Sequence, residues 1–93
     1  MSKAALNQSV LHDSKTRGRC ERNRQASMRF REQHDLHEGY LICFRGQVIM
    51  WALDLPEPSG FMPGCFAFSD EGSEFTAIDG NDLQGAKLWE CMS

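Results

Sequence analysis

The chain has 93 residues and a formal net charge of −3, with 41% hydrophobic and 25% charged residues. A chain of this length forms one domain, residues 1–93, with a small core. Its longest apolar run, residues 48–53, is far shorter than the roughly 20 residues of a membrane-spanning helix, so we expect no membrane partner. The first residues lack the apolar stretch of a secretory signal, and we therefore expect a cytoplasmic protein.

The charge is sorted along the chain. Residues 1–31 carry eight Lys or Arg and two Asp or Glu, whereas residues 32–93 carry two and eleven. Such a split predicts that the basic part is attracted either to a polyanion or to the acidic part of another copy. We accordingly divide the domain into a basic N-terminal arm, residues 1–25, and a β-rich core, residues 26–93.

The N-terminal third contains two predicted elements. Residues 4–11 have apolar side chains at helical spacing, which predicts a short helix. Residues 26–31 alternate between apolar and polar side chains, and this alternation favours a strand that pairs with residues 40–44. The alternative is that residues 20–33 form an arginine-rich helix.

From residue 39 onward, short apolar runs alternate with turn signals. Residues 40–44 and 48–53 are rich in aromatic and β-branched residues, and the loop Arg45-Gly46-Gln47 between them predicts a hairpin. Both runs are apolar on both faces, which predicts central strands covered on each side by a helix, another sheet or a second subunit. We therefore expect Trp51 in the core or at an interface.

Three prolines and two glycines make residues 55–64 a loop. Strands are predicted over residues 65–68, 74–78 and 86–92, with the last one as a closing edge strand. The predicted fold class is α+β and mainly antiparallel: a meander sheet of five or six strands with a short N-terminal helix or arm. Strong curvature of the sheet is an open alternative.

Few residues suggest chemistry. The cysteines, Cys20, Cys43, Cys65 and Cys91, include no Cys-x-x-Cys pair and mostly lie in apolar runs, which predicts buried, reduced thiols. His34 and His37 would share a helix face, but two ligands are too few for a metal site. Cys20 has basic neighbours without the signature of a nucleophile. We expect no catalytic residue, no metal and no cofactor.

The strongest functional signal is a run of arginines, a residue that forms bidentate contacts to phosphates and carboxylates. The partner-binding candidates are Arg17, Arg19, Arg22, Arg24, Arg29 and Arg31. If they bind phosphates, the arm binds nucleic acid; if they bind carboxylates of another subunit, the arm serves oligomerisation. We favour self-association because an acidic sheet repels a polyanion.

The segment from Gly39-Tyr40 to Pro58, with Arg45-Gly46-Gln47-Val48-Ile49 and Trp51-Ala52-Leu53, resembles the small orphan proteins encoded by integron mobile gene cassettes. The resemblance implies a compact accessory protein of a bacterial cytoplasm, often oligomeric.

We favour a small non-enzymatic binding or accessory protein that acts as a homo-oligomer. One alternative is a nucleic-acid-binding accessory protein that uses the basic arm. The other is a small-ligand pocket or enzyme between the sheet and the proline-rich loop, with pocket candidates Tyr40, Trp51, Phe61 and Trp89.

Overall fold

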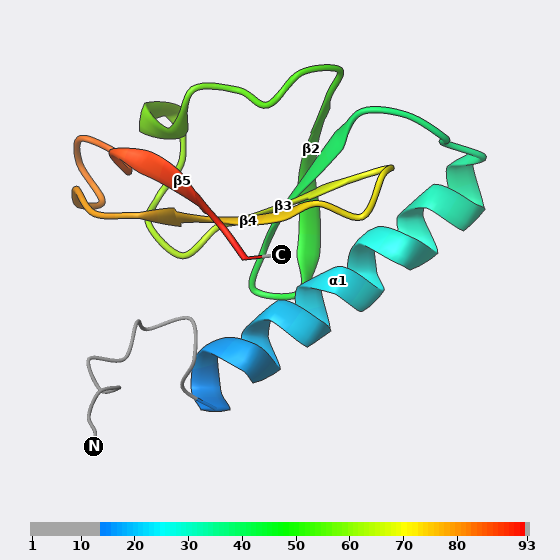
Figure 1. Ribbon diagram of the computed structural model, residues 1–93, viewed down its shortest axis with the longest axis horizontal. Coiled ribbons are helices and arrows are strands. Elements are labelled where there is room, and N and C mark those ends of the chain that lie inside the picture. The colour runs from blue at the N-terminus through cyan, green and yellow to red at the C-terminus, as the bar shows by residue number, and fades with distance from the viewer. Residues whose placement is uncertain (1–13, 93) are drawn as a thin grey trace.

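The computed structural model describes residues 14–92, which form one helix and an open five-stranded antiparallel sheet (Figure 1). The elements are α1 (Ser14–His34), β1 (Tyr40–Phe44), β2 (Gln47–Ala52), the short 3-10 helix η2 (Pro58–Gly60), β3 (Phe66–Ser69), β4 (Glu74–Ile78) and β5 (Leu88–Cys91). The predicted α+β, mainly antiparallel class is confirmed. Within the described residues, no helix combines the length and the apolar character needed to cross a bilayer.

The strand order is β2-β1-β3-β4-β5, which departs from a meander at one point. The predicted hairpin of β1 and β2 is confirmed, but β3 pairs with β1 and not with β2. The prediction that residues 48–53 form a central strand is therefore wrong, because β2 is an edge strand. The other edge is β5, as the sequence predicted.

Residues 26–31 belong to α1, so the predicted strand is wrong and the alternative helix is right. The side chains that α1 buries are Cys20, Asn23, Ala26 and Ser27. They recur every three or four residues and so lie on one helix face. Two of the four are polar, so the apolar pattern of the sequence does not reveal this face. The boundary between arm and core at residues 25 and 26 falls inside α1, and the helix predicted over residues 4–11 lies outside the described residues.

The sheet is covered on both faces (Figure 1). On one face, Cys43 of β1 and Phe66 of β3 pack in a cluster with Cys20 of α1. On the other face, Ile42 packs in a cluster that includes Phe61 from the connection between β2 and β3. Figure 1 shows α1 on one side of the sheet and this connection on the other side. The core thus consists of two layers of side chains, one on each side of β1 and β3.

The burial of β1 can be tested with Ile42, whose side chain has no exposed surface. Ile42→Ala should lower the free energy of unfolding by about 2–5 kcal/mol, because the deleted atoms leave a cavity in the core. Urea denaturation of variant and parent measures the loss. The control is Leu83→Ala, at a side chain that is 97% exposed, and it should stay within about 0.5 kcal/mol of the parent. Equal midpoints for the Ile42 variant and the parent would contradict the buried position of β1.

Candidate functional site

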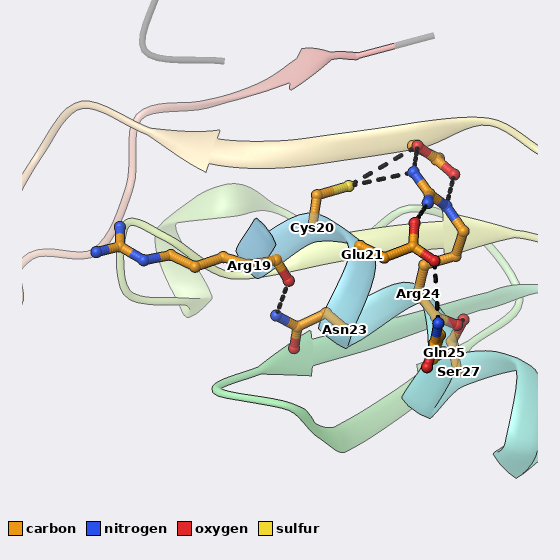
Figure 2. Close-up of polar contacts among 8 residues, drawn as sticks. Arg19, Cys20, Glu21, Asn23, Arg24, Gln25 and Ser27 are labelled. Carbon is orange, nitrogen blue, oxygen red and sulfur yellow. Dashed lines mark hydrogen bonds and ion pairs between the residues drawn. The ribbon is translucent and has the colours of Figure 1, made fainter. Parts of the chain in front are cut away.

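Arg24, one of the six candidate arginines, binds the chain's own sheet. Its Nε donates to Glu74 Oε2 at 2.5 Å, and its Nη2 donates to Glu74 Oε1 at 2.8 Å. Figure 2 shows the Arg24 guanidinium among these contacts, together with its ion pair to Glu21 on the preceding helical turn. The hydrogen bonds to Glu74 raise the pKa of Arg24 and join α1 to β4.

Arg31 is occupied by backbone carbonyls. Its Nη2 donates to the Gly39 oxygen at 2.9 Å and to the Phe68 oxygen at 3.0 Å. These bonds attach the C-terminal half of α1 to the residue before β1 and to β3. Arg24 and Arg31 therefore stabilise the fold, and the other four candidates remain exposed: Arg17, Arg19, Arg22 and Arg29.

Three of the exposed arginines form a row along α1. At about 100° per residue, Arg19, Arg22 and Arg29 fall within roughly 80° of one another around the helix axis. Arg22 lies beside the turn between β1 and β2, because a Cβ placed on Gly46 would be 3.8 Å from Arg22 Cγ. Figure 2 shows Arg19 extending away from the contacts around Arg24. We call Arg19, Arg22 and Arg29 the arginine row.

Strand β2, which follows the β1–β2 turn beside Arg22, exposes apolar side chains. Within residues 14–92, β2 pairs only with β1, and the register shifts at Ile49, which has no partner in β1. The exposed fractions are 51% for Ile49, 42% for Met50, 40% for Trp51 and 57% for Leu53, which follows the strand. We call these four residues the β2 edge surface. No residue of β2 is charged, so the strand lacks the charges with which natural sheet edges discourage pairing.

Trp51 is held in a defined position on the β2 edge surface. Its Nε1 donates to the Glu38 oxygen at 2.8 Å, and the indole passes close to Gly39. A Cβ at residue 39 would lie 2.5 Å from Trp51 Nε1, and Gly39 has φ +84°, so this position requires glycine. Trp51 pairs with Leu41 and shares the sheet face that α1 covers. Because β2 is an edge strand and Trp51 keeps 40% of its surface exposed, the expectation that Trp51 is covered in a central strand is wrong.

The four aromatic pocket candidates do not converge on one cavity. Phe61 and Trp89 pack together with ring centroids 5.6 Å apart, and Trp89 Nε1 donates to the Pro56 oxygen at 2.7 Å. Tyr40 belongs to the same cluster under the proline-rich loop. Trp51 lies on the opposite face of the sheet from these three residues. The rings of Phe61 and Trp89 thus anchor the loop to the sheet.

Two hollows on the α1 side of the sheet were not foreseen from the sequence. The larger, of about 630 Å³, lies between α1 and the β3–β4 hairpin, with Met28, Leu36 and Phe68 among its lining residues. The smaller, of about 440 Å³, is lined in part by Cys20 and Cys91. Each forms where α1 meets strands distant in sequence. The exposed Met28 on a polar helix is the one local signal that points to the larger hollow.

Three cysteines, Cys20, Cys43 and Cys65, are buried, and the predicted burial of Cys43 and Cys65 is confirmed. Burial raises the pKa of the Cys43 thiol to about 12 and also raises the pKa of Cys65. The pKa of Cys20 is raised as well, by burial and by the nearby carboxylate of Glu74, although Arg24 acts in the opposite direction. A protonated thiol is a poor nucleophile, so Cys20 lacks the activation that its basic neighbours in sequence suggested.

The two histidines considered as metal ligands lie on different segments. His34 is the last residue of α1, and its ring lies 4.2 Å from that of Phe30. His37 follows the helix, and its Nε2 lies 2.6 Å from Asp35 Oδ1. Within residues 14–92, no group of three or more His, Cys, Asp or Glu side chains is placed to hold a metal ion.

No protein-family model, curated protein or solved structure matches this chain. The resemblance to integron cassette proteins therefore stays a prediction. The geometry of the described residues is the basis for inferring function, and its two distinctive features are the β2 edge surface and the arginine row.

The accessibility of the thiols should follow their burial. A thiol reagent at about pH 8 should modify Cys91 first, because Cys91 is exposed on β5 whereas the other three cysteines are buried with raised pKa values. Mass spectrometry of digested protein locates the label, and denaturation should make all four thiols reactive. Cys91→Ser should remove the fast phase. Early modification of Cys43 in the native protein would contradict the described core.

The contact between Arg24 and Glu74 should contribute to stability. Glu74→Gln should lower the free energy of unfolding by about 1–3 kcal/mol, because Arg24 loses its charged acceptor on β4. Urea denaturation measures the loss. The matched control is Glu71→Gln in the neighbouring turn, where the side chain is exposed and the change should stay within about 0.5 kcal/mol. Equal losses for the two variants would show that the ion pair contributes nothing specific.

Proposed function

We propose that this chain is a non-enzymatic binding module that takes an extended segment of a partner polypeptide along the free edge of β2. The β2 edge surface is the observation that carries this proposal. The outer side of an edge strand presents backbone N–H and C=O groups that a partner strand can pair with, and exposed apolar side chains add contact area. The buried, protonated thiols and the separated histidines support binding rather than catalysis.

The two edges of the sheet differ as expected if only one of them binds a strand. β5 contains Glu90 and is preceded by the exposed Lys87, and charged residues on an edge discourage pairing. β2 has six residues against four in β5, and none of the six is charged. A longer, uncharged and apolar edge is the better template for an added strand.

A second copy of the chain is the second candidate occupant, and it corresponds to the homo-oligomer that the sequence favours. Every copy carries the same unpaired strand, and two β2 strands can pair antiparallel about a twofold axis. The nucleic-acid alternative would use the arginine row rather than β2. These three uses of the molecule differ in stoichiometry and in the residues they require.

The test is selection from a random library of displayed peptides about ten residues long, the upper range of strand length. Binders should be enriched on the parent chain, and hydrogen exchange should show that a bound peptide protects the amides of β2. The double variant Ile49→Gln and Met50→Gln should lose these binders, because it removes apolar contact area without changing charge. Leu83→Gln, at an exposed leucine outside the strands, is the matched control and should keep them.

The contrary results are equally specific. Absence of enrichment, or protection outside β2, would contradict the proposal of a strand-binding edge. Sedimentation of the same proteins identifies the occupant: a dimer of the parent that dissociates in the double variant, but not in the Leu83 variant, would assign the edge to a second copy.

A further inference from the structure

We propose that the segment bound at β2 is acidic, with carboxylates at alternate positions that pair with the arginine row of α1. This inference rests on the proposed function, because it names the chemistry of the partner at the same edge. Two observations carry it: the uncompensated charge of the row and the face of the sheet on which the row lies.

The positive charge of the arginine row is not neutralised within the described residues. Arg19, Arg22 and Arg29 are exposed, and none of them forms an ion pair with a residue of the 14–92 range. The two glutamates of α1 lie outside the arc of the row, about 60° beyond Arg29 for Glu32 and about 80° beyond it for Glu21. Glu21 pairs with Arg24 and lines the smaller hollow, and Glu32 lines the larger one. The side of the helix next to the β1–β2 turn therefore carries arginines without a carboxylate among them.

The row lies on a face that an added strand would reach. Trp51 and Leu41 share the sheet face that α1 covers, so every second side chain of a strand paired with β2 would point to this face. From Arg19 to Arg29 the helix rises about 15 Å. Three carboxylates at alternate positions of a strand span about 13 Å. The two lengths are similar, but α1 runs obliquely to β2 (Figure 1), so the member of the row placed beside the β1–β2 turn is Arg22. Guanidinium groups bind carboxylates in a bidentate manner.

The opposite face of the added strand meets different chemistry. Met50 pairs with Ile42 and lies on the face that carries the apolar cluster under the β2–β3 connection. Side chains of the partner on this face would contact the exposed part of Met50 and should be apolar. The predicted pattern of the partner is therefore acidic, apolar, acidic, apolar, acidic.

Charge also argues against a second β2 strand as the occupant. In an antiparallel pair of β2 strands about a twofold axis, both helices lie on the same face of the joined sheet, with the arginine rows on facing sides. The two β1 strands would be about 14 Å apart, at three strand spacings, and α1 packs on β1. Opposed side chains then come within a Debye length of about 8–10 Å, so the rows repel each other. An acidic segment replaces this repulsion with attraction.

The experiment compares two synthetic peptides of about ten residues, one alternating Glu with Val and the other alternating Lys with Val. The Glu peptide should bind the full chain at least about tenfold more tightly at low salt, and the difference should shrink as the salt concentration rises. Arg22→Glu should weaken binding of the Glu peptide by roughly tenfold. Lys87→Glu makes the same charge change at the opposite edge and should leave the affinity unchanged.

The results separate this inference from the proposed function. Equal affinities for the two peptides, with both lost in the Ile49→Gln and Met50→Gln double variant, would overturn the inference and leave the strand-binding edge standing. Binding of neither peptide, with no protection of β2, would overturn both. A single-stranded oligonucleotide that binds the parent, loses affinity in the Arg22 variant and leaves β2 unprotected would assign the row to nucleic acid and overturn the inference.

Discussion

Burial of β1 between two layers is the constraint on which the rest of the structure depends. Leu41, Ile42 and Cys43 have no exposed surface, so both faces of the sheet must be covered. A chain of this size has few segments that can pack on both faces of its sheet. Here α1 packs on one face and the β2–β3 connection packs on the other. The packing of this connection and of α1 on opposite faces of the sheet excludes water from β1 and β3.

Directional polar contacts position the helix, because its buried face is only partly apolar. Asn23 accepts a hydrogen bond from the Gly46 N–H at 2.9 Å, Arg24 binds Glu74, and Arg31 binds the Phe68 carbonyl. Contacts of this kind fix one orientation of α1 more sharply than apolar packing, which tolerates sliding. They also divide the arginines into two groups: those that bind the sheet and those that remain on the surface.

The proposed binding surface is a product of topology. If β3 followed β2 in a meander, β2 would be flanked by strands on both sides and would have no free edge. Because β3 pairs with β1 instead, β2 becomes an edge whose apolar side chains face solvent. The attachment of α1 through Arg24 and Arg31 then leaves the arginine row on the side of the β1–β2 turn. One change of strand order thus creates the surface, and the helix contacts add its charge.

The sequence by itself determined the features that depend on neighbouring residues. These include the β1–β2 hairpin, the strand Glu74–Ile78, the edge position of β5, the burial of Cys43 and the presence of an arginine-rich segment. The tertiary structure alone decided that residues 26–31 are helical, that β2 is an edge, and which arginines bind the sheet. The physical reason is that propensity and turn signals act over a few residues. Strand order depends on pairs such as Cys43 with Phe66, 23 positions apart, and the partner of Arg24 is Glu74, 50 positions away. Local patterns carry no information about contacts over such separations.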